Sequence, residues 1–405
     1  MNFKPRYVRL LCAAVLLLFI FAPFAFAADV TDPDGEIIGI ANRGAWHEYP
    51  ENSIPAVLKA AETGIDAVLV NVSVTSDGVP VLMEENSVSR MLDGADKDSV
   101  SLCTIEELSG FYLKESSGGP NNKTSEYKIP TLDEALDAAK KNGITLVLKT
   151  DAGNCDAVTS VIKDAENTVI YLTGKEKTVK AAAEKYGNTY NIFTEKRGNI
   201  IFIQTAFTDF MSANGVKGVV LKTTNRYGVN FNQTLLKHFY GKIRAAADTS
   251  DPTLAGARED TEKWWNDLIS RGYSVIITND PQSFADYKKS NAAARDKLTE
   301  AFEEYTQNWQ LPQFKSIIFN DYKKAYTDAV NEAQRLLDDK SSSTQEMNDC
   351  RASLIKACDD IDMNYEALEA GKAGMTVSAP RIGLCIGAVI VVVAVQVFFF
   401  KRRER

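Results

Sequence analysis

The sequence predicts an α/β protein in which a sheet domain is followed by a small helical bundle and one transmembrane helix. Strand-like apolar runs alternate with helical stretches over residues 34–288. Strand signals are absent from 291–373, where Ala, Glu, Lys, Asp and Gln recur with helical periodicity. An apolar run at 382–400 lies near the end of the chain. Alternating strands and helices favour parallel strands, in either a (β/α)8 barrel or a doubly wound sheet.

Residues 1–27 have the pattern of a secretory signal peptide. Lys4, Arg6 and Arg9 precede an apolar core at 10–21, and the small residues of an A-x-A site follow at 25–27. This order predicts cleavage after residue 27. An uncleaved signal anchor is the alternative, but the apolar core is short for a membrane span.

The other end of the chain predicts a membrane anchor. Residues 382–400 are apolar apart from Gln396 and are about long enough to cross a bilayer. The tail at 401–405 is basic, and Lys and Arg beside a span stay on the cytoplasmic side. A buried core helix would leave those charges unexplained. We therefore expect a single-pass protein of the cell membrane, with the bulk of the chain extracellular and the C-terminus cytoplasmic.

The first strand–helix–strand unit is expected at 37–94. Apolar runs predict three strands, at 37–41, 67–74 and 79–83. Pro50-Glu51-Asn52-Ser53 predicts a helix start, and Ser76-Asp77-Gly78 predicts a turn. Polar residues that follow strand ends are where folds of this class place their chemistry.

Six further strands and five helices complete the expected sheet domain. The strands are expected at 145–149, 168–172, 200–204, 218–222, 243–247 and 274–278. The helices are expected at 132–141, 176–185, 207–213, 233–240 and 259–270. The nine strand candidates exceed by one the eight places of a closed barrel.

Several of these segments resemble the glycerophosphodiester phosphodiesterase family. In chain order they read NRG (42–44), PEN (50–52), VLVNVSVTSDGVPVLMEEN (68–86), IPTLDEAL (129–136), TLVLK (145–149) and VIITNDP (275–281). The resemblance covers about 36–288 and implies a TIM (β/α)8 barrel, which we expect at 28–290. It also implies a phosphoric diester hydrolase of lipid metabolism, in which carboxylates hold a divalent metal and two histidines transfer protons.

The sequence departs from the family's pattern at its reactive positions. Asn42 and Glu84 stand where the family has its two histidines, and Leu69, Asn71 and Val147 stand where it has metal-binding carboxylates. Apolar side chains cannot ligate a cation, and a neutral amide binds hard cations weakly. The resemblance therefore implies the fold and argues against the family's hydrolysis, so we expect a pseudoenzyme and no cofactor.

Three retained residues favour a binding or scaffolding function. Arg43, Glu51 and Lys149 match the family, in which Arg43 and Lys149 lie beside the phosphate. Two cations without competing carboxylates would suit phosphate or a phosphodiester, bound without turnover. The alternative is that Arg43 pairs with Glu51 and braces the first loop, and the two interpretations are compatible.

An active hydrolase with a rearranged site is an alternative function. It would need Ca²⁺ or Mg²⁺ at a displaced site, with Glu84, Glu85 and Asp151 as candidate ligands and His47 as a candidate acid–base group. Solvated loop carboxylates are the simpler interpretation of these acids. The second histidine, His238, lies in a helical stretch and is expected to be a packed or surface residue.

The region 291–373 predicts a bundle of two to three antiparallel helices. Apolar residues recur at helical spacing in stripes that begin at Leu298, Tyr322 and Leu354, and Thr344 is a candidate N-cap. Residues 314–361 resemble the FIVAR-type helical module of Gram-positive surface proteins. That resemblance implies either a stalk or a third candidate function, binding to cell-wall polysaccharide.

Charge and cysteine usage limit the partners and the cross-links. The net charge is −8 and no long basic run lies outside the termini, so nucleic acid is not an expected partner. Cys350 and Cys358 lie eight residues apart on one expected helix, about 12 Å at the helical rise, which is too far for a disulfide. A disulfide between Cys103 and Cys155 is one possibility. Otherwise we expect these cysteines to be buried thiols.

Overall fold

The computed structural model describes residues 29–162, 167–197, 201–222, 232–250, 260–307 and 320–375. The expected signal peptide, membrane span and basic tail lie outside these ranges. Among the helices within them, none is both long and apolar enough to cross a membrane. The chain divides into two compact units, one of Met1–Arg258 with Ser274–Gln282 and one of Glu259–Tyr273 with Ser283–Arg405.

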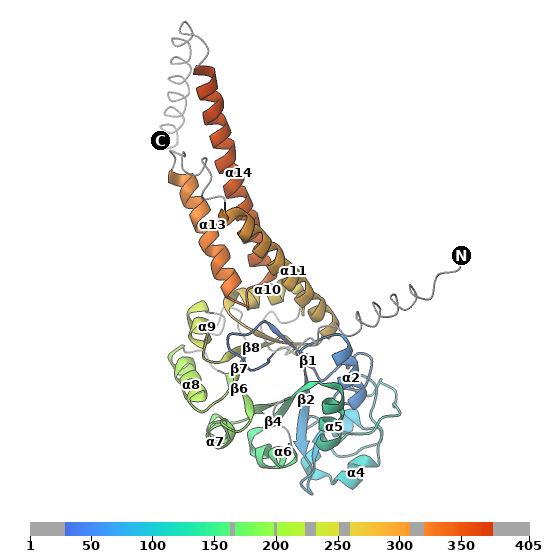
Figure 1. Ribbon diagram of the computed structural model, residues 1–405. Helices are drawn as coiled ribbons and strands as arrows, with labels where there is room; N and C mark the ends of the chain where they lie inside the picture. The colour runs from blue at the N-terminus through green and yellow to red at the C-terminus, as the bar shows by residue number, and fades with distance from the viewer. Residues whose placement is uncertain are drawn as a thin grey trace, which may run out of the picture. The chain divides into compact units, whose positions relative to one another are not determined.

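Eight parallel strands close the first unit into a barrel, which confirms the expected TIM (β/α)8 class (Figure 1). Pairing of β1 with both β2 and β9 closes the ring. A further strand, β3 (Pro80–Leu82), pairs antiparallel with β2 and is not part of the ring. In sheet order the barrel strands are β1 (Ile38–Asn42), β2 (Ala67–Val74), β4 (Thr145–Asp151), β5 (Thr168–Thr173), β6 (Asn191–Arg197), β7 (Gly218–Lys222), β8 (Arg244–Asp248) and β9 (Val275–Thr278).

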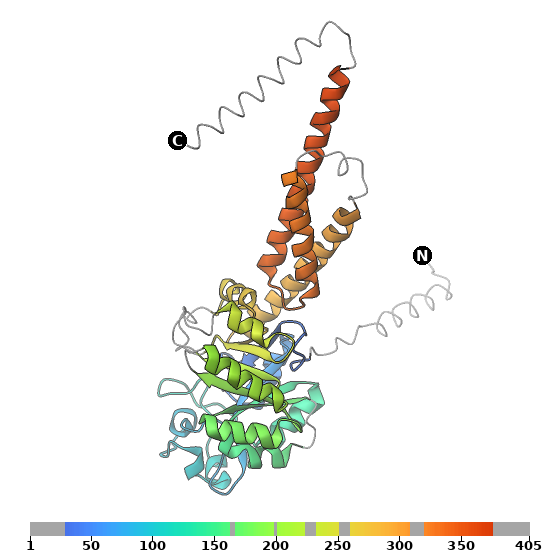
Figure 2. The same cartoon turned by 90° about the vertical axis from the view of Figure 1, so that its left-hand side faces the viewer.

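Helices of the first unit cover the outside of the strands (Figures 1 and 2). The longer ones are α2 (Ile54–Glu62), α5 (Leu132–Asn142), α6 (Cys155–Val161), α7 (Glu176–Tyr186), α8 (Ile201–Ala213) and α9 (Gln233–Phe239). The predicted helix start at PENS is confirmed, because the Ser53 hydroxyl accepts the Ala56 N–H at 3.3 Å as an N-cap. Thr131 and Glu134 form a capping box at the start of α5.

An insertion between β3 and α5 adds a small domain-like element with its own core. It contains α3 (Val88–Met91), η1 (Val100–Leu102) and α4 (Ile105–Ser109). Buried apolar side chains from β3 through residue 129 pack together as a cluster separate from the barrel interior. We call residues 84–128 the insertion.

The barrel interior is filled by side chains from all eight strands of the ring. Because side chains alternate between the two faces of a strand, every second residue points inward. The strand register places inward residues opposite one another, as for Leu69 and Val147. The buried interior cluster is Val30, Ile38, Ile40, Ala67, Leu69, Val147, Val169, Tyr171, Phe193, Val220, Ala246, Val275 and Ile277.

The amino end of the barrel is closed by the segment that precedes β1. Val30 belongs to the interior cluster and is 3% exposed. Arg244, the first residue of β8, donates to the carbonyl oxygens of Asp29 at 3.1 Å, Gly35 at 3.2 Å and Glu36 at 2.8 Å. Burial lowers the pKa of Arg244 to about 10, against the effect of nearby aspartates. A site is therefore expected at the opposite, carboxyl end of the strands.

The strand predicted at 200–204 is wrong. Its described residues belong to α8, and the fifth barrel strand is β6, which the pattern missed. A short apolar run fits a buried strand or a buried helix equally well, so Ile201-Phe202-Ile203 was ambiguous. The sequence of β6, Asn-Ile-Phe-Thr-Glu-Lys-Arg, is polar because its carboxyl half lines the barrel opening. With this exchange, the nine candidates resolve into eight barrel strands and β3.

The second unit is a helical bundle built from α10 (Glu262–Arg271), most of α11 (Pro281–Thr306), α13 (Asn320–Asp338) and α14 (Thr344–Met375). Helices α13 and α14 run side by side in opposite directions in Figures 1 and 2. Leu298, Tyr326 and Leu354, from the three expected stripes, share one buried cluster. The expected boundary near residue 290 falls inside α11.

The N-cap of α14 is Ser343, not Thr344. The Ser343 hydroxyl accepts the Glu346 N–H at 3.2 Å, and the Glu346 carboxylate accepts the Ser343 N–H at 3.1 Å. This reciprocal pair is a capping box, and Thr344 is already helical. The pattern of consecutive hydroxyl residues allowed either choice, and the Glu three positions after Ser343 decides it.

Four cysteines are free and buried, so the pairing left open for Cys103 and Cys155 does not occur. Burial raises the thiol pKa to about 11 for Cys155 and Cys350 and to about 12 for Cys358. Burial also raises the pKa of Cys103. Thiolate, the reactive form, is therefore scarce at neutral pH.

We expect these four thiols to resist iodoacetamide at pH 8 in the folded protein and to react fully in guanidinium chloride. Peptide mass spectrometry of the alkylated protein would map each site. Failure of Cys103 and Cys155 to react after denaturation without reductant would instead demonstrate a disulfide.

Candidate functional site

The carboxyl ends of the barrel strands bring seven polar side chains to one opening. Each lies two residues beyond a member of the interior cluster and so points into the barrel one layer higher. In parallel barrels this end carries the chemistry. We call this set the mouth: Asn42, Asn71, Lys149, Glu195, Lys222, Asp248 and Asn279.

Amide side chains line the part of the mouth formed by β9, β1 and β2. The Asn42 amide donates to the Asn279 side-chain oxygen at 3.1 Å, and the Trp46 indole N–H donates to the same oxygen at 3.1 Å. Asn52 accepts the backbone N–H of Asn71 at 2.8 Å. Asn42 and Asn71 are each 9% exposed. This part of the mouth is neutral and held by hydrogen bonds.

Arg43 lies in the turn after β1, and two contacts hold its side chain. Its guanidinium pairs with Glu51 and lies 5.0 Å from the centre of the Trp46 ring. Its backbone has φ of +61°, a left-handed conformation that few side chains adopt. The next residue, Gly44, has φ of +76°, and a Cβ there would lie 2.6 Å from the Ala56 carbonyl. The predicted pairing of Arg43 with Glu51 is confirmed.

Lys149 projects into the mouth from β4. Its ammonium lies 5.8 Å from the centre of the Tyr171 ring on the next strand. Within the described residues, no carboxylate lies within ion-pair distance of it. The Tyr171 hydroxyl donates to Glu195 at 3.3 Å. Burial, aided by the negative charges of Glu195 and Asp248, raises the pKa of Tyr171 well above its usual value, so this hydroxyl stays protonated.

Sequence reasoning missed an ion pair on the opposite side of the mouth. Lys222 and Asp248 are in contact at 2.7 Å, and both side chains are less than 10% exposed. Asp248 also accepts hydrogen bonds from the backbone and hydroxyl of Ser250. Like Glu195 and Asn279, these residues lie two positions after a buried apolar residue. Side chains alternate between the two faces of a strand, so counting two residues on from each buried inward residue would have identified them.

The three acids proposed as substitute metal ligands have other partners. Glu84 is exposed and lies 3.5 Å from Arg90. Glu85 accepts hydrogen bonds from Ser99 and Ser101, which lower the pKa of its carboxyl despite the opposing effect of burial. Asp151 is exposed and caps η2 (Ala152–Asn154) by accepting the Gly153 N–H at 2.8 Å.

The residues at the family's metal positions do not fit a divalent cation. Leu69 and Val147 are 1% exposed, face each other in register, and offer only hydrocarbon. Asn71, two residues further along β2, has a neutral side chain whose amide donates to the Asn52 side-chain oxygen at 3.5 Å. In the part of the chain that is described, no three His, Cys, Asp or Glu side chains are grouped to hold one metal ion. Hard cations require oxygen ligands, several of them charged.

The two histidines occupy different environments. His47 is exposed beside the mouth, with its ring centre 3.7 Å from that of Trp46. His238 lies on α9 and contacts Asp209 at 2.9 Å, as expected for a surface helix residue. His47 therefore lies in the loop that carries Arg43, and it has no described carboxylate within hydrogen-bond distance.

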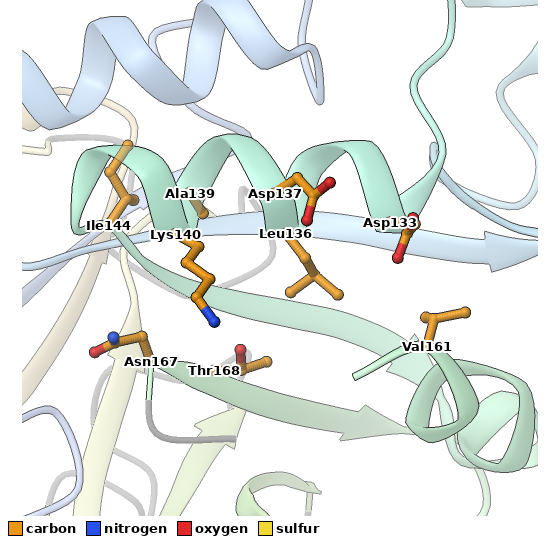
Figure 3. A pocket seen from close by; sticks show the side chains of 9 residues that line it. All are labelled: Asp133, Leu136, Asp137, Ala139, Lys140, Ile144, Val161, Asn167 and Thr168. Carbon is orange, nitrogen blue, oxygen red and sulfur yellow. The ribbon is translucent and has the colours of Figure 1, made fainter. Parts of the chain in front are cut away.

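A cavity of about 80 Å³ in the first unit lies away from the mouth (Figure 3). It lies between α5, the end of α6 and the amino end of β5, and Leu136 and Lys140 extend toward it from α5. None of the mouth residues lines it. Its volume suits a few water molecules rather than a glycerophosphodiester, which needs a pocket of roughly 300 Å³ or more.

The buried pair Lys222–Asp248 leads to a stability prediction. Asp248→Asn removes the carboxylate that contacts the buried Lys222 ammonium and should lower the free energy of unfolding by about 3–5 kcal/mol. The double variant Lys222→Met/Asp248→Leu should cost less than this single change, because no charge stays buried alone. Urea denaturation followed by circular dichroism measures both. A double variant that is less stable than Asp248→Asn would contradict this account.

Residues 43–193 match the model of the Glycerophosphoryl diester phosphodiesterase family. The chain is 31% identical to glycerophosphodiester phosphodiesterase 1 of Mus musculus over 156 residues, which are 37% of this chain and 45% of that protein. It is 35% identical to the Homo sapiens protein of the same name over 136 residues, 33% of this chain and 40% of that protein. The aligned part thus spans less than half the length of these relatives.

Solved structures of this kind show lower similarity. A glycerophosphoryl diester phosphodiesterase from Parabacteroides distasonis has a TM-score of 0.49 and 20% identity, over 62% of this chain and 86% of that one. An Oleispira antarctica phosphodiesterase, solved with the product sn-glycerol-3-phosphate, has a TM-score of 0.46 and 17% identity, over 62% and 95%. By sequence, residues 43–193 are therefore similar to the Glycerophosphoryl diester phosphodiesterase family.

Proposed function

We propose that this protein binds a phosphate or phosphodiester group at the barrel mouth and does not hydrolyse it. The observation that carries the proposal is the pair Leu69 and Val147. Both are buried and in register at positions where the resemblance places metal-binding carboxylates. Without a metal and with Asn42 in place of a histidine, the phosphodiester would lack both charge neutralisation and proton transfer.

Retained cations support the binding half of the proposal. Lys149 has no described acidic partner and is free to neutralise an anion. The Arg43 side chain is 21% exposed, and its guanidinium pairs with Glu51. Guanidinium and ammonium groups form strong, charge-assisted hydrogen bonds to phosphate oxygens.

The location of the barrel is part of the same proposal. A signal peptide at 1–27 and a span at 382–400 would place the barrel outside the cell, on a membrane anchor with a cytoplasmic basic tail. A binding or scaffolding module in that position would meet phosphate-containing headgroups and polymers near the membrane surface. Fractionation and protease accessibility of the full chain in intact cells would test the topology.

Binding should depend on the two mouth cations. Isothermal titration with glycerophosphocholine, glycerophosphoglycerol and inorganic phosphate should give affinity that Arg43→Met and Lys149→Met each weaken at least tenfold. Lys97→Met removes a half-buried lysine of the insertion that pairs with Glu107, so it serves as the matched control and should bind normally. Absence of binding by the unaltered protein would refute the proposal.

Hydrolysis provides the second test. Release of glycerol phosphate from either diester, with Ca²⁺ or Mg²⁺ present and abolished by Arg43→Ala, would support the alternative of an active hydrolase with a displaced site at Glu84, Glu85 or Asp151. We expect no release above that of a heat-denatured sample. Zero turnover together with measurable binding is the result that the proposal requires.

Back-substitution tests whether the scaffold has lost only its ligands. The triple variant Leu69→Glu/Asn71→Asp/Val147→Glu places carboxylates at Leu69 and Val147, which pair in register, and a third at Asn71, two residues further along β2. If it folds, we expect Ca²⁺ or Mg²⁺ to raise its melting temperature and to leave that of the unaltered protein unchanged. A metal-induced shift in the unaltered protein would show that another set of residues binds the ion.

The cell-wall alternative has one observation in its favour. An open groove of about 620 Å³ lies within the second unit, between α10 and the start of α14. Its polar lining could hydrogen-bond to sugar hydroxyls, although no aromatic side chain among the described lining residues offers a stacking surface. The lining residues are Glu262, Lys263, Asn266, Asp267, Ser270, Ser343, Gln345 and Glu346. Pull-down of the full chain with purified wall polysaccharide, compared with Asn266→Ala/Gln345→Ala, would test it.

A further inference from the structure

The non-glycine residues with a left-handed backbone conformation lie around one residue, Glu51. Among the described residues they are Arg43, Asn52 and Ser116, with φ of +61°, +58° and +54°. Asn52 directly follows Glu51 and donates its N–H to the Arg43 carbonyl at 3.1 Å. Glu51 itself donates its N–H to the Ser116 carbonyl at 2.9 Å. Such conformations persist where surrounding contacts enforce them, and they mark functional sites more often than other loops.

The Glu51 carboxylate is completely buried and is shared by two arginines. One oxygen pairs with Arg43, and the other accepts from Arg90 at 2.6 Å. Arg43 comes from the turn after β1, whereas Arg90 comes from α3 in the insertion. Two guanidinium groups and one carboxylate leave this cluster with a net charge of +1. Exposed Glu84, at 3.5 Å from Arg90, offsets little of that charge because solvent screens it.

Arg90 also fixes the loop of the insertion that reaches Glu51. Its guanidinium donates to the Ser117 carbonyl, and its own carbonyl accepts the Gly119 N–H at 2.7 Å. Gly118 has φ of +69°, and a Cβ there would lie 2.4 Å from the Arg90 carbonyl. The 116–119 turn is therefore built closely around Arg90, and through Ser116 it is joined to Glu51.

Arg90 determines how much positive charge Arg43 presents. With Arg90 in place, Glu51 divides its charge between two partners, and the Arg43 Nε–H is left without a hydrogen-bond partner in the described residues. Without Arg90, the whole carboxylate would be available to Arg43. The resulting Arg43–Glu51 pair would have no net charge and would attract an anion weakly. The Arg43 guanidinium would also be free to move away from the Trp46 ring.

We propose that Arg90 is a positioning residue for the anion site: it holds Glu51, keeps that carboxylate from fully offsetting the charge of Arg43, keeps Arg43 against Trp46, and couples anion binding to docking of the insertion. This inference rests on the proposed function. Coupling is reciprocal, so an anion bound at Arg43 must stabilise the 116–119 turn as much as the docked turn favours the anion.

The test compares Arg90→Met and Arg90→Lys with the control Lys97→Met, using glycerophosphoglycerol titrations. Arg90→Met should weaken binding about tenfold or more, Arg90→Lys should weaken it less, and Lys97→Met should bind normally. Hydrogen–deuterium exchange should show glycerophosphoglycerol protecting residues 113–119 in the unaltered protein and not in Arg43→Met. Thermal melting verifies that each variant is folded.

Trp46 provides a readout that reduced stability alone would not change. Its fluorescence, obtained as the difference between each protein and its Trp46→Phe counterpart, should shift in folded Arg90→Met without ligand, because Arg43 leaves the indole face. If Arg90→Met does not fold, Arg90→Lys carries the same two measurements.

The outcomes separate the two proposals. An unaltered protein that does not bind glycerophosphoglycerol overturns the proposed function and this inference with it. An unaltered protein that binds, with folded Arg90 variants that bind as tightly and have an unchanged Trp46 spectrum, overturns the inference alone. Weaker binding, lost protection and a shifted spectrum in the Arg90 variants support it.

Discussion

Closure of eight parallel strands into a ring is the constraint on which the first unit depends. Closure fixes the register, and alternation within that register decides which side chains face the axis. One set of inward positions becomes a buried apolar cluster, and the set two residues further along becomes the mouth. The segment before β1 and Arg244 close the amino end, so the carboxyl end is left for polar groups.

The same constraint explains why Leu69 and Val147 argue strongly against a metal. These positions lie in the interior, where an apolar side chain joins the cluster and stabilises the fold by roughly 1.5–3 kcal/mol on burial. Carboxylates at these places would need a cation to offset their desolvation. At these positions, carboxylates together with a bound metal give a stable fold, and apolar side chains without a metal also give a stable fold. Intermediate combinations cost stability.

Charge in and around the mouth is matched almost everywhere. Glu51 pairs with Arg43 and Arg90, Asp248 pairs with Lys222, and Glu195 pairs with Arg197 at 2.7 Å. Lys149 has no carboxylate within ion-pair distance in the described residues, and the surplus guanidinium charge around Glu51 is offset only in part, by exposed Glu84. A ligand that completes this arrangement would carry negative charge, and the insertion contributes Arg90 to the cluster around Glu51.

The sequence by itself determined the barrel class, most strand positions, the helix start at PENS and the helical character of the second unit, because those depend on local periodicity and capping. It also pointed to Arg43, Glu51 and Lys149 through family motifs. Tertiary structure decided what periodicity cannot express. It assigned polar Asn191–Arg197 to the fifth barrel strand and apolar 201–204 to a helix, because ring closure selects residues by position rather than by hydropathy. It also paired Lys222 with Asp248 and Arg90 with Glu51, since contacts between residues distant in the chain arise only when the strands and the insertion are placed in space.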